Sequence, residues 1–135
     1  MTVIELMAVV CIVGILSAAA MVSFKPMLEK HRLSLSTQNL EGILQSYRMK
    51  AILQNTTYEI RIGGKYLLSR RQQDEHWEEW RKQQFLTEAS VDFSGSVYID
   101  GKGFMTPKTI HLRYGKSDQY LVININGRMR RSELQ

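Results

Sequence analysis

Residues 1–24 read MTVIELMAVVCIVGILSAAAMVSF, and this stretch decides the architecture of the chain. After Glu5, the 19 residues from Leu6 to Phe24 carry no charge, which is about the length of a helix that crosses a bilayer. A carboxylate at the edge of such a segment is costly, because a mid-membrane acid requires roughly 3 kcal/mol for insertion and less near a helix end. The position of Glu5 therefore indicates a functional acid rather than part of a passive anchor.

This stretch resembles the N-terminus of mature type IV pilins and type II secretion pseudopilins. The resemblance is carried by Thr2–Met7 and by Ile12–Ala19. It implies that prepilin peptidase cleaves a precursor before Met1 and that Met1, where the family usually has Phe, is N-methylated. It also implies that Glu5 pairs with the N-terminal amine of a neighbouring pilin or pseudopilin subunit during filament assembly. Opposite charges attract strongly in apolar surroundings because little water screens them.

The resemblance implies a location as well. The protein would cross the inner membrane once with a periplasmic head, and would lie in a periplasmic or cell-surface filament after assembly. Lys25, Lys30 and Arg32 follow the apolar segment, and positive charge there ordinarily favours the cytoplasmic side. The orientation therefore rests on the resemblance and not on the charges.

A chain of 135 residues suits one small domain plus an anchor. We expect a transmembrane or filament-core segment over residues 1–26 and a globular head over 27–135. The head would contain an amphipathic helix at 27–54 and a β-sheet at 57–131. The only cysteine is Cys11, so no disulfide forms within the chain. Because many major pilins close a C-terminal loop with a disulfide, this favours a minor pilin or a pseudopilin.

The first element is predicted to be one helix from about residue 2 to 54. Pro26 lies inside it and predicts a kink or local break near residues 22–26. Apolar residues then recur at helical spacing on one face: Leu40, Ile43, Leu44, Tyr47 and Ala51. The opposite face is polar: Gln38, Glu41, Gln45, Arg48 and Gln54. At about 75 Å, such a helix is too long for a small head to cover, so its first half must be buried in a membrane or filament core.

The remainder of the chain shows strand patterns. Residues 58–62 alternate between apolar and charged, and Gly63-Gly64 predicts a hairpin turn into a strand at 66–68. We expect residues 70–84 to form a polar loop that leads into a strand at about 80–88. Further strands are predicted at 97–99, 110–112 and 120–123. The fold class is therefore α+β and pilin-like, with a long N-terminal helix packed on an antiparallel β-sheet head.

The C-terminal half resembles the GspH/FimT branch of this superfamily, which contains a type II secretion minor pseudopilin and a type IV minor pilin. The similar segments are Phe93–Gly95, Gly101–Phe104, Thr109–Leu112 and Val122–Arg130. Residues 65–90 match least well.

Motifs of enzymes are absent from the sequence. His31, His76 and His111 are scattered, and no Cys or His lies at metal-ligand spacing from them, so we expect no catalytic residue, metal or cofactor. The acids Asp74, Glu75, Glu78 and Glu79 are interpreted as a solvated loop. Trp77 and Trp80 either pack over the sheet edge, which we favour, or contact another subunit.

Positive charge is concentrated in the C-terminal third. The whole chain carries +5, whereas residues 102–131 carry +6 and the remainder −1. Clustered Lys and Arg attract phosphate backbones and release counterions. The candidate DNA-binding residues are Lys102, Lys108, Arg113, Lys116, Arg128, Arg130 and Arg131.

Gly127–Arg130 matches a Gly-Arg-any-Arg signature that resembles the DNA-contacting end of some minor pilins from naturally transformable bacteria. On a strand, Arg128 and Arg130 would point to the same face and could grip successive phosphates. The same short string also occurs in secretion-system members. Basic tails also pair with acids on neighbouring subunits, and the Asp74–Glu79 loop could supply such acids.

The favoured function is that of a non-enzymatic minor pilin or pseudopilin that helps to initiate or cap a type IV pilus or type II secretion-like filament. The alternative is a DNA-binding minor pilin that acts in DNA uptake through its basic C-terminal region. A single-pass membrane protein unrelated to filaments is supported only by the apolar stretch.

Overall fold

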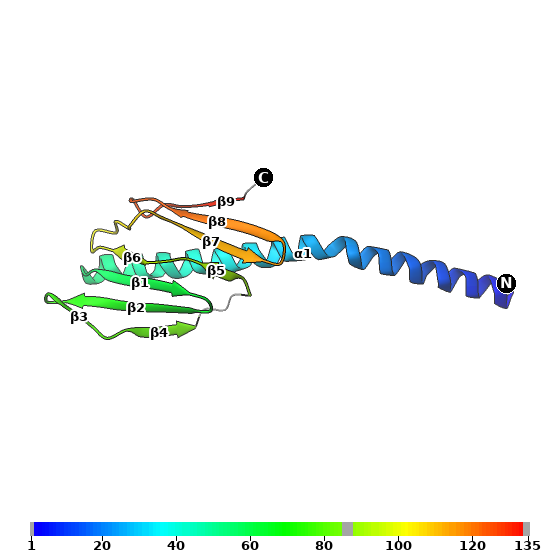
Figure 1. Ribbon diagram of the computed structural model, residues 1–135, viewed down its shortest axis with the longest axis horizontal. Coiled ribbons are helices and arrows are strands. Elements are labelled where there is room, and N and C mark those ends of the chain that lie inside the picture. The colour runs from blue at the N-terminus through cyan, green and yellow to red at the C-terminus, as the bar shows by residue number, and fades with distance from the viewer. Residues whose placement is uncertain (1, 85–87, 134–135) are drawn as a thin grey trace.

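The computed structural model describes residues 2–84 and 88–133. Its first element is one long helix, α1 (Val3–Gln54). Thr2 caps its first turn, and Asn55 ends it in a left-handed conformation (φ 47°) that Asn tolerates better than most residues. Its 52 residues span about 78 Å. Only the second half lies against the head, while the first half projects away from it (Figure 1). The predicted helix is therefore present, with a free half and a packed half.

The helix continues through Pro26, where the sequence predicts a kink or a local break. The prediction of a break is wrong, because helical residues continue on both sides of the proline. Proline removes one backbone donor, and long flanking helical segments tolerate that loss. Figure 1 shows α1 only gently bowed where the free half meets the head.

The first sheet follows the helix, and all of its pairings are antiparallel. Its order is β3-β2-β1-β6, and β4 also pairs with β2. Its strands are β1 (Tyr58–Gly63), β2 (Tyr66–Gln73), β3 (His76–Trp77), β4 (Arg81–Gln84) and β6 (Ser96–Ile99). The predicted hairpin is confirmed, and its turn lies at Gly64-Lys65, one residue later than Gly63-Gly64 suggested.

The prediction of a loop over residues 70–84 is wrong. β2 continues to Gln73, and β3 folds back on it by pairing Gln72 with Trp77. The polar sequence conceals this hairpin because both faces of its end carry long polar side chains rather than an apolar–polar alternation. A strand follows at Arg81–Gln84, within the range predicted for it. Residues 85–87 of that predicted strand lie outside the described residues.

The second sheet has the order β5-β7-β8-β9 and is also antiparallel. Its strands are β5 (Ser90–Asp92), β7 (Lys108–Tyr114), β8 (Ser117–Ile123) and β9 (Met129–Ser132). Figure 1 shows the two sheets along the packed half of α1, one on each side of the helix in that view. The α+β pilin-like fold is thus confirmed, with two small sheets in place of the single sheet that was expected.

The core forms where α1 meets both sheets. Leu40, Leu44 and Ala51 of the helix are fully buried, and Tyr47 is nearly so, as their spacing predicts. The first sheet contributes Ile60, Leu67, Val97 and Ile99, and the second contributes Ile110, Leu112, Leu121 and Ile123. Ile43 is half-buried at the margin of this core. The apolar face of the helix therefore positions both sheets.

The opposite helix face is not wholly solvent-exposed, because part of it bonds to the second sheet. Gln45 Nε2 donates to the carbonyl oxygen of Gly127 at 3.1 Å, and Glu41 pairs with Arg131 at 3.8 Å. Arg48 donates to the carbonyl oxygens of Gly103 at 2.9 Å and Asn126 at 3.2 Å. Polar residues of α1 thus hold the loops at the far end of the head.

Candidate functional site

The first candidate site is the N-terminal turn of α1. The Thr2 N–H donates to Glu5 Oε2 at 2.8 Å, and the Glu5 N–H donates to Thr2 Oγ1 at 3.4 Å. This reciprocal capping box partners two backbone donors that have no acceptor within the helix. Glu5 is therefore already hydrogen-bonded within its own chain. The proposed partner atom, the amine of Met1, lies outside the described residues.

The helix around Glu5 is apolar and exposed. Val3, Ile4, Val10 and Ile15 are each at least 64% exposed. Within the described residues, α1 contains the one helix stretch that is long and apolar enough to cross a membrane, and none of that stretch is buried. Cys11 is also exposed here, as a free thiol. Such a surface needs an apolar environment or a partner to cover it.

The seven basic candidates for DNA binding do not form one patch. Arg113 is bonded to Asp118 at 2.9 Å, and Arg131 turns toward the helix and pairs with Glu41. Among the described residues, the remaining five have no ion-pair partner: Lys102, Lys108, Lys116, Arg128 and Arg130. The ion pairs thus leave fewer free cations than the sequence count suggests.

The five free cations lie at two ends of the head. Lys116 lies in the β7–β8 turn, where its backbone N–H donates to Glu29 of α1 at 3.4 Å. Arg128 precedes β9 at the far end of the head, in a turn whose Asn126 is bonded to Arg48. Figure 1 shows these two turns at opposite ends of the second sheet. Lys116 is therefore remote from Arg128.

Arg128 and Arg130 do not both belong to a strand, although a common strand was expected. Arg128 is in the turn before β9, and its carbonyl oxygen accepts from the Asn124 N–H at 2.9 Å. Arg130 lies in β9 opposite Val122. Both side chains are exposed. The far end of the head therefore carries Lys102 and Arg128 next to the loops that Arg48 holds, and sequence reasoning had placed Arg48 only on a polar helix face. The Lys108 ammonium instead lies beside Gly95.

Two glycines make room for Arg48 there. Gly103 and Gly127 have φ of 86° and 73°, a region that side chains with a Cβ rarely adopt. A Cβ on Gly127 would lie 2.5 Å from Arg48 Nε, and one on Gly103 would lie 3.2 Å from the same atom. The Gly in Gly127-Arg128-Met129-Arg130 therefore has a packing role, independent of any contact by the arginines.

A buried carboxylate that sequence reasoning did not single out lies on the first sheet. Glu59 of β1 is fully buried and accepts hydrogen bonds from Arg70 Nε and Ser96 Oγ, each at 2.6 Å. Arg61 Nη2 lies 3.2 Å from the same carboxylate. The pKa of Glu59 lies below its ordinary value: burial raises it, but the bonds from Ser96 and Arg70 lower it by more. Alternation along residues 58–62 placed Glu59 toward solvent, so only the contacts of distant residues reveal its burial.

The acidic loop was expected to be solvated, and that holds for only part of it. Asp74 and Glu75 are exposed in the β2–β3 turn, both with positive φ. Glu78 instead pairs with Arg71 and, at 3.6 Å, with Arg81.

Trp77 and Trp80 pack over Arg70 of the first sheet, as the favoured alternative predicted.

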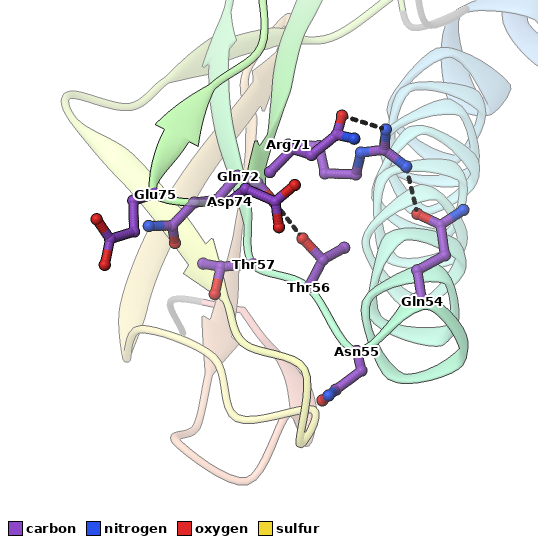
Figure 2. A pocket seen from close by; sticks show the side chains of 9 residues that line it. Gln54, Asn55, Thr56, Thr57, Arg71, Gln72, Asp74 and Glu75 are labelled. Carbon is purple, nitrogen blue, oxygen red and sulfur yellow. Dashed lines mark hydrogen bonds between the residues drawn. The ribbon is translucent and has the colours of Figure 1, made fainter.

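A polar pocket of about 410 Å³ lies between the end of α1 and the β2–β3 turn (Figure 2). Its cation, Arg71, is bonded to Gln54, Gln73 and Glu78, and Thr56 Oγ1 donates to the carbonyl oxygen of Gln72. Figure 2 shows Asp74 between Gln72 and Thr56, whereas Glu75 points away from the end of the helix. These bonds hold the last turn of the helix against β2, so we interpret the pocket as structural.

Metal-binding geometry is lacking in the described residues, which hold no group of three His, Cys, Asp or Glu side chains close enough to share an ion. His111 is bonded to Asp118 at 2.9 Å and stacks on Tyr120 with ring centroids 4.6 Å apart. His76 lies next to the backbone oxygen of Asp74.

Solved structures share this fold. A structure of the minor pseudopilin EpsH from the Type 2 Secretion System of Vibrio cholerae matches with a TM-score of 0.60 and 18% identity, covering 76% of this chain and 97% of that one. A second structure of the same pseudopilin matches with a TM-score of 0.58 and 15% identity, covering 76% and 94%. No protein-family model and no curated protein matches the chain. The chain thus has the pilin-like fold of a minor pseudopilin, as the sequence resemblance implied.

Proposed function

We propose that this protein is a minor pseudopilin subunit that helps to initiate or cap a type II secretion-like filament. The observation that carries the proposal is the exposed, uncharged half of α1 in front of a head with the fold of a minor pseudopilin. Residues 1–26 would hold the protein in the inner membrane and later lie in the filament core. Residues 27–135 would form the periplasmic head.

Glu5 would act at the assembly step. In lipid, its carboxylate is partnered by the backbone of Thr2, which lowers the cost of keeping an acid there. During assembly, the methylated amine of Met1 on a neighbouring subunit would bond to the same carboxylate, where little water screens the attraction. The protein's role would then be structural rather than enzymatic, and its partners would be other pilin-like subunits. Prepilin peptidase would act on its precursor.

The test is Glu5→Gln in the full chain, expressed with the other pilin-like subunits of its own filament. We expect incorporation into filaments to fall at least about tenfold, because one charge pair in apolar surroundings exceeds the 1.4 kcal/mol that corresponds to a factor of ten. The circular dichroism of the head should not change. Glu29→Gln is the matched control, because Glu29 lies on the same helix beyond the apolar stretch. Equal incorporation of Glu5→Gln and Glu29→Gln would refute the assembly role.

DNA binding during uptake is the second candidate function. It is supported by the unpaired, exposed cations Arg128 and Arg130, with Lys102 in the neighbouring loop that Arg48 holds. Phosphate binding by such a group weakens steeply with salt, because each neutralised phosphate releases counterions.

The experiment titrates the full chain in detergent with a short DNA duplex over a range of salt concentrations. Arg128→Gln/Arg130→Gln should reduce both the affinity and the slope of its salt dependence. Arg113→Gln/Lys116→Gln removes the same charge at the other end of the sheet and should leave binding largely intact. Absence of binding at low salt, or equal losses in both double variants, would refute a DNA site at this end.

A further inference from the structure

Aromatic rings and guanidinium groups gather on the outer face of the first sheet. We name this surface the aromatic–arginine face and define it by Glu59, Arg61, Arg70, Trp77, Trp80, Lys82 and Tyr98. β1 and β2 place Glu59 opposite Arg70, and β6 places Tyr98 on the other side of Glu59. The filament role proposed above does not use this surface.

The side chains of this face are stacked and bonded into one rigid unit. The Arg70 guanidinium lies 4.7 Å from the ring centroid of Trp77 and 4.5 Å from that of Trp80. The Arg61 guanidinium lies 4.6 Å from Trp80, and the Trp77 and Tyr98 rings are 6.3 Å apart. Because Glu59 anchors both guanidinium groups from below, the indoles lose little further freedom on binding a partner.

This face remains partly exposed. Trp77 is 36% exposed and Tyr98 is 44% exposed. Tyr66, four residues before Arg70 on β2, is 43% exposed with Lys82 Nζ 3.7 Å from its ring. Trp, Tyr and Arg are the residues that dominate the energetic centres of protein interfaces. The aromatic–arginine face contains Trp, Tyr and Arg in a fixed arrangement with exposed ring edges. It therefore has the composition of the energetic centre of a protein interface.

The charge of the face selects the partner. Arg61, Arg70 and Lys82 carry three positive charges against the one negative charge of Glu59, so an acidic partner is complementary. We propose that the aromatic–arginine face docks an acidic segment of a different protein. Its carboxylates meet Arg61 and Lys82, and its apolar side chains pack on the exposed edges of Trp77 and Tyr98.

The contacts disfavour a nucleic acid as the occupant of this face. A nucleic acid would need open ring faces for base stacking, but the Arg70 guanidinium covers a face of each indole. A second copy of this chain would offer its own exposed acids Asp74, Glu75 and Glu79, and the dependence of binding on protein concentration distinguishes that occupant.

Intrinsic fluorescence reports this face selectively, because Trp77 and Trp80 are the only tryptophans in the chain. The experiment titrates the full chain in detergent with a synthetic 12-residue peptide in which Glu alternates with Leu or Pro. The matched probe replaces every Glu with Gln. We expect a saturable change in Trp emission with the acidic peptide and at least about tenfold weaker binding of the Gln peptide.

Variants test the location of binding. Arg61→Gln/Lys82→Gln should weaken binding of the acidic peptide about tenfold or more, whereas Lys30→Gln/Lys116→Gln removes equal charge elsewhere and should not. Tyr98→Ala keeps every charge and should also weaken binding, which separates a docking site from general attraction. Thermal unfolding confirms that each variant is folded.

Several results would overturn the proposal: no emission change with the acidic peptide, equal binding of the Gln peptide, or equal losses in both charge variants. A 12-nucleotide oligothymidine that binds while the acidic peptide does not would assign the face to nucleic acid instead. An emission change with protein concentration alone would assign it to a second copy. The assay needs no filament, so its failure leaves the filament proposal unaffected.

Discussion

Glu59 and Arg70 lie directly opposite each other on β1 and β2, and Arg70 Nε donates a 2.6 Å hydrogen bond to a carboxylate that is fully buried. The pair lies on the outer face of the sheet, where solvent would ordinarily reach both residues. Trp77 and Trp80 cover it by stacking on the guanidinium. A buried carboxylate is tolerated only when its partners are present, so this pair ties β1, β2 and the tryptophan segment together.

Removal of the Glu59 charge should therefore destabilise the head. We expect Glu59→Gln to lower the free energy of unfolding by about 2 kcal/mol, because Arg70 and Arg61 lose a charged acceptor. Thermal unfolding of the full chain in detergent measures the loss. Glu79→Gln is the control for the same substitution at an exposed position. Similar stability of the two variants would show that the buried carboxylate adds nothing to the fold.

Stability should depend on pH below the unfolded-state pKa of Glu, about 4.3. The pKa of Glu59 is lowered in the folded state, since the bonds from Ser96 and Arg70 outweigh the effect of burial. A group with a lowered folded pKa contributes stability above its unfolded pKa, and that contribution disappears as the pH falls through its folded pKa. The pKa of Asp118 is lowered by hydrogen bonds from Arg113 and His111, so it acts in the same direction.

The unfolding free energy should therefore fall as the pH drops below about 4, and Glu59→Gln should make that fall shallower. Asp118→Asn should remove a separate, smaller part, because its side chain is 35% exposed. Unfolding measured in buffers from about pH 6 to pH 2 checks this prediction. An identical acid slope in the protein and in Glu59→Gln would contradict it.

Gly127→Ala tests the close approach of Arg48 to the turn before β9. The substitution should cost about 2 kcal/mol, because Ala disfavours a φ of 73° and its Cβ would lie 2.5 Å from Arg48 Nε. Gly63→Ala is the matched control, since Gly63 has nothing within 4 Å of an added Cβ and no positive φ. Chemical unfolding compares the two, and a larger cost at Gly63 would be inconsistent with this packing.

Leu44→Ala tests whether α1 is part of the core of the head. Leu44 is fully buried between the helix and the sheets, so its truncation should cost about 3 kcal/mol. Met49→Ala on the exposed side of the same helix should cost less than about 1 kcal/mol, since Met49 is 58% exposed. A comparable loss in both variants would contradict the placement of Leu44 in the core of the head.

Thr2→Val tests the capping box at the N-terminus of α1. It removes the hydroxyl oxygen that accepts the Glu5 N–H, so the first turn should lose about 1 kcal/mol of local stability. Amide hydrogen exchange of residues 3–6 should accelerate, while exchange in the core strands stays unchanged. Unaltered exchange in the first turn would show that the cap contributes nothing there.

Local sequence patterns predicted the secondary structure well in some parts of the chain and poorly in others. The helix with Leu40, Leu44, Tyr47 and Ala51 on its buried face followed from spacing, because helical periodicity is a local property. The β2–β3 hairpin did not, because its polar residues carry no alternation and pair only through backbone bonds. The interruption expected at Pro26 did not occur, since the surrounding helix tolerates one missing donor.

The candidate sites also differ in how far the sequence alone could reveal them. Glu5 is distinctive in sequence because a charge beside an uncharged stretch can be recognised without any tertiary contact. The basic region was recognisable as a charge count, but its division between two ends of the second sheet was not. Nor could the sequence reveal that Glu41 and Asp118 neutralise Arg131 and Arg113, because those partners meet only after folding.

By itself, the sequence determined that an uncharged helix begins beside an acid, that its second half has one apolar face, and that strands follow. These features depend on residues within a few positions of one another. The tertiary structure alone decided that the strands form two sheets, that Glu59 is buried beneath Arg70 and two indoles, and that Arg48 holds the loops at Gly103 and Asn126. Each of these depends on side chains far apart in the chain, whose contacts form only when helix and sheets pack together.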